Sequence, residues 1–334
     1  MKIIVPMAGM GKRMRPHTLT IAKPLIPIAG KPIVQRLVED IVKVCQDKVD
    51  EIAYIIHPSF GKATEDNLVK VAESLGAKGT IHYQSEALGT AHAILCAKEA
   101  LTGNVVVAFA DTLFRADFKL DNTAEGIIWV KQIEDPSQFG VVKLDSNGNI
   151  TDFVEKPEHF VSDLAIIGIY YFKDGEYLCR ELQYLIDNNI TDKGEYQLTN
   201  ALENMQKKGT LFKPGTVNDW LDCGNKAITV QTNQRYLDFI GNETLVSNTV
   251  KQINSVIVPP SYVGPNVVLE NTVVGPYASI GENTNIKNSV ISNSIVQTNS
   301  KIVNQIITNS MVGNHVNLVG KPLDVSIGDY TTIE

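Results

Sequence analysis

Residues 2–18 read KIIVPMAGMGKRMRPHT, an apolar run that passes directly into a loop rich in glycine and basic side chains. The run KIIVPM predicts a buried strand, and the segment KPIVQRLVEDIVKVC at 31–45 repeats its apolar residues at helical spacing. A strand, a glycine turn and a helix in this order gather backbone N–H groups around one point, which favours phosphate binding. The start of the chain therefore predicts an α/β domain with an anion site after its first strand.

Strands and helices continue to alternate along the first half of the chain. Further buried strands are predicted at 51–57, 79–84 and 104–111, and helices at 63–76 and 89–101. Such alternation is typical of a mostly parallel sheet with helices on both faces, which binds ligands beyond the carboxyl ends of its strands. The opening loop and Asp111 both lie at such ends. Shorter strands between 126 and 172 and three helices between 177 and 240 are predicted to complete the sheet.

From about residue 250 the sequence becomes poor in charge and rich in Asn, Val and Ile. Apolar residues recur at intervals of six in four runs, namely Ile257, Val263, Leu269; Val274, Ile280, Ile286; Val290, Val296, Ile302; and Val312, Leu318. An inward aliphatic residue with Asn or Gly at the corner is typical of a β-helix, here of about three to four coils. The phase slips between runs, which predicts an interrupting loop or irregular turn. A small β-sandwich is the alternative.

The chain has 334 residues, which predicts two domains, and its net charge is −7. This charge argues against nucleic-acid binding, and no apolar run approaches the length of a membrane span. The absence of a signal-peptide pattern and the wide spacing of the four cysteines predict a reduced, cytoplasmic protein. Residues 1–38 differ, because they hold seven Lys and Arg and no Asp or Glu. A positive zone in an acidic chain indicates a small polyanionic ligand.

The opening loop fits neither of the common nucleotide-binding motifs. Met14 stands where GxGxxG requires its third glycine, and no Ser or Thr follows Lys12 as the P-loop requires. The pattern GxGxRMxPxT, followed by KPLIPIAGKP at 23–32, instead resembles the signature of the sugar-1-phosphate nucleotidylyltransferases. The chain is most similar to glucose-1-phosphate thymidylyl- and uridylyltransferase-like members with a C-terminal hexapeptide-repeat domain. It departs from the signature at two positions. Ala8 stands where the family usually has glycine, and Lys12 stands where it often has threonine.

The resemblance continues in order over about residues 2–240. The matching segments are QSEALGTAHAI (84–94), FADTLF (109–114), DPSQFGVV (135–142), FVEKP (153–157), IIGIYYF (166–172), GEYQLTNAL (194–202) and WLDCGN (220–225). The resemblance implies Arg13, Lys23 and Asp111 as catalytic residues, and Mg²⁺ held by Asp111 and Asp222. The residues that it implies for substrate binding are Ala8, Gly9, Gly11, Lys12, Gln84, Gly89, Thr90, Gly140, Glu155, Lys156, Gly168 and Tyr170.

The implied reaction joins a nucleoside triphosphate to a sugar 1-phosphate and releases pyrophosphate. The amide of Gln84 can pair with the imide edge of thymine or uracil by donating and accepting at once, which favours dTTP or UTP and leaves guanine and adenine open. Glu155 is implied to contact sugar hydroxyls, and Lys156 the sugar phosphate. Glucose 1-phosphate is favoured by analogy with the similar pyrimidine enzymes. No general base is needed, because a phosphate monoester is already ionised near neutral pH.

The expected architecture is a Rossmann-like nucleotidyltransferase domain at 1–240, a linker at 241–252 and a short left-handed parallel β-helix at 253–334. The left hand is implied by the resemblance alone. The β-helix is expected to mediate homo-oligomer formation. Two alternatives stay open: a catalytically silent regulatory subunit, and a bifunctional enzyme whose β-helix adds acyl transfer with His315 as its base. The presence of Arg13, Lys23, Asp111 and Asp222 favours an active enzyme.

Overall fold

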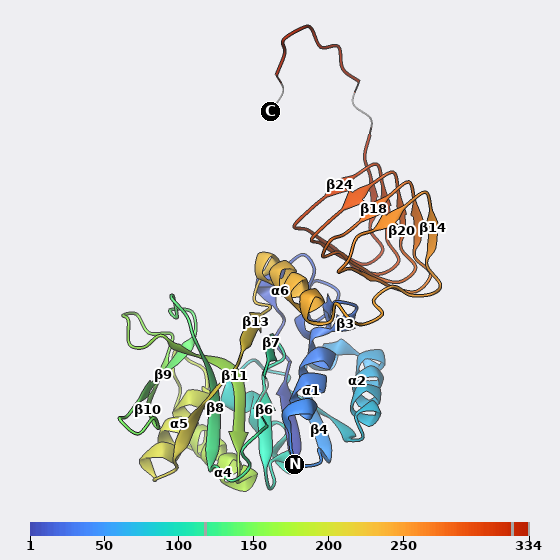
Figure 1. The fold of residues 1–334 in the computed structure, drawn as a ribbon. Coiled ribbons are helices and arrows are strands. Elements are labelled where there is room, and N and C mark those ends of the chain that lie inside the picture. The colour runs from blue at the N-terminus through green and yellow to red at the C-terminus, as the bar shows by residue number, and fades with distance from the viewer. Residues whose placement is uncertain (117–118, 322–323, 333–334) are drawn as a thin grey trace. The chain divides into compact units, whose positions relative to one another are not determined.

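The computed structural model describes residues 1–116, 119–321 and 324–332, and the chain forms two compact units (Figure 1). Unit 1 comprises Met1–Ile26 and Lys31–Gly224, and unit 2 comprises Pro27–Gly30 and Asn225–Glu334. The chain therefore passes from one unit to the other three times, after Ile26, after Gly30 and after Gly224. The domain boundary at residue 240 stays a prediction.

A nine-stranded sheet forms the centre of unit 1, in the order β10-β9-β11-β6-β1-β4-β5, with β8 paired to β11 and β12 to β8. Its strands are β1 (Lys2–Pro6), β4 (Glu51–Ile56), β5 (Lys78–Tyr83), β6 (Val105–Ala108), β8 (Gly126–Gln132), β9 (Gly140–Leu144), β10 (Ile150–Glu155), β11 (Leu164–Phe172) and β12 (Phe212–Thr216). β1 pairs in parallel with β4 and β6, whereas β11 runs antiparallel to β6, β8 and β9. The predicted α/β sheet, mixed and mostly parallel, is confirmed.

The helices of unit 1 lie beside this sheet (Figure 1), and most of their buried residues are apolar. They are α1 (Ile33–Val44), α2 (Lys62–Ser74), α3 (Thr90–Leu95), α4 (Gly175–Asp187) and α5 (Leu198–Lys207), with short 3-10 turns η1 (Lys12–Met14), η2 (Lys23–Leu25), η3 (Pro58–Phe60) and η4 (Lys98–Ala100). The helix predicted at 89–101 ends early, because Ala97 and Ala100 bond three residues back and tighten the backbone. No helix among the described residues is long and apolar enough to cross a membrane.

A separate pair of strands lies beside the main sheet of unit 1. β7 (Thr112–Arg115) and β13 (Asp219–Asp222) are antiparallel, and Thr112 lies opposite Asp222 in their register. The N–H of Cys223 donates to the carbonyl of Asp111 over 3.1 Å and extends the pairing by one bond. This ladder brings together two aspartates that are more than a hundred residues apart in the sequence.

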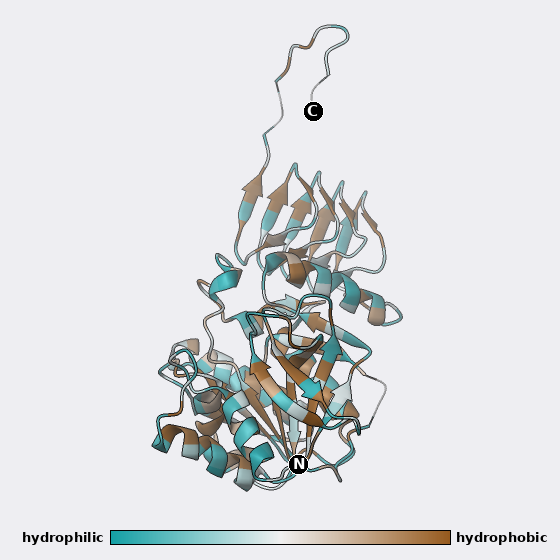
Figure 2. Ribbon diagram, turned by 90° about the vertical axis from the view of Figure 1, so that its left-hand side faces the viewer, coloured by the Kyte–Doolittle hydropathy of each residue, from teal (hydrophilic) through white to brown (hydrophobic). Residues whose placement is uncertain are grey.

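Three parallel sheets form the sides of a β-helix in unit 2, which confirms the predicted coil (Figure 2). Their orders are β14-β17-β20-β23-β26, β15-β18-β21-β24 and β16-β19-β22-β25. The strands are β14 (Lys251–Ile253), β15 (Val256–Ile257), β16 (Tyr262–Val263), β17 (Val268–Glu270), β18 (Val273–Val274), β19 (Ser279–Ile280), β20 (Asn285–Lys287), β21 (Val290–Ile291), β22 (Ile295–Val296), β23 (Lys301–Val303), β24 (Ile306–Ile307), β25 (Met311–Val312) and β26 (Asn317–Val319).

The coils are shorter than three hexapeptides, and this corrects one predicted core position. Asn254 bonds to Asn271, 17 residues on, whereas Asn288 bonds to Asn304, 16 residues on. Some sides of the coil therefore have five residues instead of six. These shorter sides, and not an interrupting loop, shift the spacing of the apolar residues between runs. Val290, predicted to point inward, is 41% exposed, and its neighbour Ile291 is fully buried instead.

Asparagine occupies the corners of the coils, where the backbone turns with positive φ. Asn266, Asn283 and Asn299 hold one such position in successive coils, at φ values of 57°, 57° and 58°. Asparagine adopts this left-handed conformation at lower cost than most residues. His315, the histidine considered for acyl transfer, takes the same position in the next coil at φ 57°. Its place in the fold is therefore that of a corner residue.

One buried asparagine ties three segments of unit 2 together. Asn233 lies on α6 (Lys226–Phe239) and is fully buried. Its Oδ1 accepts from the N–H of Ala29 over 2.9 Å and from the hydroxyl of Ser279 over 2.7 Å. Each of these donors would cost about 1–3 kcal/mol if it were left buried and unpaired. The short N-terminal segment, α6 and the β-helix therefore share one polar junction.

Candidate active site

A cavity of about 510 Å³ opens in unit 1 beyond the carboxyl ends of β1 and β6. Ten of the residues predicted to act on substrate line it: Ala8, Gly9, Gly11, Lys12, Arg13, Lys23, Gln84, Gly89, Thr90 and Asp111. These residues come from four separate stretches of sequence, and parallel strand ends bring them to one place. The cavity therefore contains basic groups, a carboxylate and an amide.

The basic loop after β1 is shaped by Gly11, whose φ is 58°. A Cβ at this position would lie 2.7 Å from Cβ of Lys23, so a larger residue would displace the lysine. The hydroxyl of Thr18 donates to the carbonyl of Gly11 over 2.8 Å and closes the loop. A 3-10 turn follows at Lys12–Met14, and the helix predicted at 31–45 forms farther along the chain as α1. The exposed side chains of Lys12 and Arg13 thus reach the cavity from a tight loop.

Two of the predicted catalytic residues form an ion pair at the cavity wall. Nζ of Lys23 lies 3.1 Å from Oδ2 of Asp111. Only 8% of the lysine side chain is exposed, whereas 47% of the aspartate side chain is. Coulomb attraction is strong where water is largely excluded, so this carboxylate fixes the position of the ammonium group. Asp111 keeps half of its surface open toward the cavity and so remains accessible to a cation.

Asp222 completes a pair of carboxylates across the β7–β13 ladder. Burial raises its pKa, the charge of Lys23 lowers it, and the charge of Asp111 raises it again. Because Asp222 lies opposite Thr112, the neighbour of Asp111, the two carboxylates stand at the same end of the ladder. Carboxylate oxygens are ligands that Mg²⁺ prefers, and the ion commonly takes only one or two of them from protein. Among the described residues no cluster of three or more His, Cys, Asp or Glu could hold a metal.

The opposite wall contains the amide of Gln84. Its Nε2 lies 3.2 Å from the carbonyl oxygen of Gly89 and 3.1 Å from Nδ1 of His92. Both amide hydrogens therefore have partners within the protein, and Oε1 is the group left for a ligand. The expected pairing of Gln84 with a base, in which the amide would donate and accept at once, stays a prediction. Gly89 has φ 111°, and a Cβ there would lie 2.4 Å from the carbonyl oxygen of Tyr196.

Thr90 lines the cavity, but its hydroxyl is already used within unit 1. It donates to Oε1 of Gln197 over 3.1 Å and accepts from the N–H of Leu198 over 2.9 Å. The N–H of Tyr196 also donates to the carbonyl of Leu88 over 2.8 Å. These bonds hold the loop before α5 against the loop before α3.

Sequence reasoning missed several residues of the cavity. They are Pro6, Met7, Met10, Pro24, Ala87, Ala93, Phe109, Ala110, Glu195 and Gly224. Most are neighbours in sequence of predicted residues, so proximity was the available signal. Glu195 is different, because it enters the wall through the bonds of Tyr196 to the loop before α3. Glu195 lies in the matching segment GEYQLTNAL at 194–202, and that match was the available signal.

Three predicted sugar-binding residues lie together at the β9–β10 pair, outside the lining of the cavity. Gly140 faces Glu155 in register, and a Cβ on the glycine would lie 3.1 Å from Oε2 of Glu155. Nζ of Lys156 lies 3.6 Å from Oε1 of the same glutamate. Glycine at position 140 thus leaves room for the carboxylate, which stands beside a half-exposed lysine.

Gly168 and Tyr170 on β11 connect this cluster with the cavity. The carbonyl of Gly168 accepts from the N–H of Phe109 over 3.0 Å, and the rings of Tyr170 and Phe109 meet edge to face at 6.1 Å. Phe109 lines the cavity. Burial raises the pKa of Tyr170, and the charges of Glu155 and Asp111 raise it further. The hydroxyl of Tyr170 therefore interacts electrostatically with Asp111 of the cavity and with Glu155 of the β9–β10 pair.

Comparison with known proteins gives consistent matches. The family described as "Nucleotidyl transferase" matches residues 2–238. The bifunctional protein GlmU of Methanocaldococcus jannaschii is 32% identical over 244 residues, which are 73% of this chain and 56% of that protein. A glucose-1-phosphate thymidylyltransferase of Streptomyces antibioticus is 29% identical over 267 residues, which are 77% of this chain and 71% of that protein.

A solved structure shares the fold. The crystal structure of a UDP-glucose pyrophosphorylase complexed with UDP-glucose matches with a TM-score of 0.59 and 23% identity, and the match covers 71% of this chain and 98% of that chain. The chain spans only 56% and 60% of the length of two GlmU relatives, from Methanocaldococcus jannaschii and Methanococcus maripaludis.

Proposed function

The chain belongs to the nucleotidyl transferase family, and we propose that it transfers a nucleotidyl group from dTTP or UTP to a sugar 1-phosphate. Glucose 1-phosphate is the favoured acceptor, and the products are a nucleotide sugar and pyrophosphate. The observation that carries the proposal is the placement of Asp111 beside buried Lys23 and next to Thr112, which lies opposite Asp222 in the ladder. The name of the Streptomyces antibioticus relative supports the thymidylyl form.

In the proposed reaction, an oxygen of the sugar phosphate attacks the α-phosphorus and the bond to the β-phosphate oxygen breaks on the opposite side. Pyrophosphate leaves with the electron pair of that bond. Two polyanions must meet, so neutralising their charge is the main task of the site. Arg13 and Lys12 supply positive charge from the loop after β1, and Lys23 supplies it from the wall. The guanidinium of Arg13 can contact two phosphate oxygens at once.

Asp111 and Asp222 would hold Mg²⁺, which fits their oxygen ligands and their proximity. When bound, the ion supplies positive charge to the phosphate oxygens. Glu155 and Lys156 would contact the sugar hydroxyls and the sugar phosphate. In this proposal residues 1–240 form the catalytic domain and residues 253–334 serve assembly.

Pyrophosphate release tests the proposal directly. Purified protein is incubated with Mg²⁺, glucose 1-phosphate and each of dTTP, UTP, CTP, GTP and ATP. We expect release with dTTP or UTP, and its loss on addition of EDTA. Release with GTP or ATP alone would overturn the assignment of the base and keep the reaction. If every nucleotide and a panel of other sugar 1-phosphates give no release, the catalytically silent subunit becomes the better interpretation.

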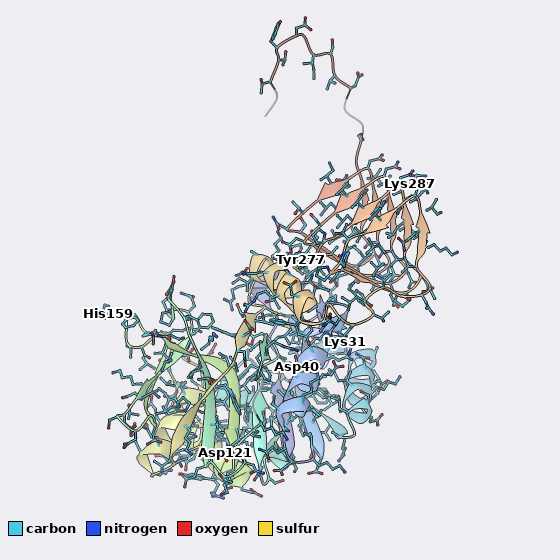
Figure 3. All side chains as sticks on the ribbon, in the orientation of Figure 1. Lys31, Asp40, Asp121, His159, Tyr277 and Lys287 are labelled. Atoms are coloured by element: carbon cyan, nitrogen blue, oxygen red, sulfur yellow. The ribbon has the colours of Figure 1, made fainter. Side chains whose placement is uncertain are left out.

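We also propose that two copies of this chain associate through the β-helix. The side formed by β15, β18, β21 and β24 displays an aligned, exposed apolar row of Val256, Val273, Val290 and Ile306. The other two sides of the coil differ from this one. One of them carries charged residues such as Lys287 (Figure 3), which pairs with Glu270. The third is bonded to α6 through Asn233. A groove lies along this row, and the described side chains that line it are the row itself and uncharged polar residues such as Asn271 and Asn288. In a two-fold contact this row would meet the same row of a second copy, and because the row is uncharged the two copies would not repel each other there.

Ile306→Asp is expected to shift the protein from dimer to monomer in analytical ultracentrifugation. Ile306 is 85% exposed, so a charge there is solvated in the monomer and buried in the dimer. Val319→Asp is the matched control, because Val319 is an aliphatic residue, 52% exposed, on another side of the coil. A monomeric wild-type protein at the highest concentration tested, or equal shifts in both variants, would contradict the proposed interface.

A further inference from the structure

His92 lies beside the cavity without lining it, and it contacts the side chain proposed to face the nucleobase. It belongs to α3, two residues after Thr90, and is partly buried. The sequence alone indicates packing or hydrogen bonding for this residue. Its contact with Gln84 gives it a more specific role.

The orientation of the Gln84 amide follows from its neighbours. The carbonyl oxygen of Gly89 can only accept a hydrogen bond, so the amide atom 3.2 Å away must be the nitrogen. The same nitrogen lies 3.1 Å from Nδ1 of His92. An amide nitrogen donates and does not accept, so Nδ1 must be unprotonated and the ring hydrogen must be on Nε2.

The neutral ring fits its surroundings. Burial lowers the pKa of His92 below its ordinary value of 6.5, and the negative charge of Glu86 raises it by less. Glu86 lies in the loop before α3, and Glu195 enters the cavity wall from the loop before α5. A neutral imidazole, with Nδ1 unprotonated and able to accept from Gln84, is therefore the form present near pH 7.

We propose that His92 is a positioning residue that, with Gly89, holds the Gln84 amide so that Oε1 faces the nucleobase as a hydrogen-bond acceptor. This inference rests on the proposed function, because it assumes that the base of the triphosphate enters beside Gln84. An acceptor in this place matches the N3–H donor of thymine or uracil. Without His92, one of the two bonds that orient the amide is lost and the amide turns more freely.

Three variants separate this role from simple packing. His92→Phe keeps a ring but removes the acceptor, whereas His92→Asn keeps an acceptor oxygen close to the position of Nδ1. His82→Phe is the matched control, because His82 is another partly buried histidine of unit 1, bonded to Thr80 rather than to a cavity residue. Circular dichroism and melting temperature show that each variant folds.

Binding and turnover are measured separately, with UTP, with dTTP and with the N3-methyl analogue of whichever binds. For His92→Phe we expect Kd and KM to rise about five- to tenfold, the effect of one neutral hydrogen bond, with kcat nearly unchanged. Discrimination against the N3-methyl analogue should weaken by the same factor. His92→Asn and His82→Phe should both behave like the wild type.

Acidification provides a readout that packing would not give. Below the lowered pKa of His92, Nδ1 carries a proton and becomes a donor. It can then no longer accept a hydrogen bond from the amide nitrogen of Gln84. We therefore expect Kd of the wild type to rise as the pH falls below 6.5, and Kd of His92→Asn to rise less. Parallel pH profiles for the two proteins would overturn the inference.

The outcomes distinguish this inference from the proposed function. If the wild type binds UTP or dTTP but releases no pyrophosphate, the proposed function fails and the binding data still decide the role of His92. If the wild type is active and His92→Phe binds like it, the role of His92 is wrong and the function stands. If the wild type binds neither nucleotide, both are overturned.

Discussion

Asp111→Asn is expected to lower the rate of pyrophosphate release by at least about 10²–10³-fold, the cost of removing one preorganised charge-stabilising group. The substitution keeps the shape of the side chain and removes its negative charge. It thereby weakens both the proposed Mg²⁺ site shared with Asp222 and the 3.1 Å ion pair with Lys23. The rate is measured with saturating Mg²⁺, and the melting temperature shows whether the variant folds.

Asp121→Asn is the matched control for this change. Asp121 is an exposed aspartate outside the cavity (Figure 3), and its Oδ1 accepts from the N–H of Thr123 over 3.0 Å, which an asparagine oxygen can also do. We expect it to retain full activity. If Asp111→Asn kept the wild-type rate at the same Mg²⁺ concentration, the proposed metal site would be wrong.

Arg13→Ala is expected to reduce kcat by about 10²–10³-fold, because the lost guanidinium would no longer stabilise charge on the triphosphate. Arg13→Lys should recover only part of the rate, since an ammonium group lacks the planar fork that contacts two oxygens. Arg15→Ala is the control: Arg15 carries the same charge in the same loop, is exposed, and does not line the cavity. Steady-state kinetics at one ionic strength compare all three.

Comparing the kcat of Arg13→Ala with that of Arg15→Ala shows whether the loop contacts the phosphates directly or acts through its overall charge. A large effect at Arg13 alone indicates direct contact with the phosphates. Equal, small effects at both positions would mean that the loop only raises the local positive potential, and the catalytic role of Arg13 would be wrong.

Much of the fold follows from local patterns in the sequence. Runs such as Val105–Ala108 are buried on both faces of the sheet and so contain almost only aliphatic residues. The β-helix was predictable because one aliphatic residue per side must point inward. The number of residues at each corner was not, because it depends on how the turn closes in space. Val290 was misplaced for that reason.

The residues of the candidate site also fall into those that the sequence could predict and those that it could not. The loop after β1 and Asp111 were predictable, because strand ends can be located from the sequence and ligands bind beyond them. The link between Gln84 and His92 was not, because it depends on how the turn at Gly89 folds back. The segment that contains Glu195 matched the family in sequence, but its place in the cavity wall needed the tertiary structure, since backbone bonds hold its loop in place.

The junction at Asn233 has a consequence for the order in which the chain folds as it is synthesised. Ala29 leaves the ribosome early, but its bonding partner follows 204 residues later. Pro27–Gly30 must therefore wait, without its final partners, until α6 and the first coils have emerged. A fragment that begins at Asn225 would never contain this segment, so the C-terminal unit cannot be excised intact by a single cut.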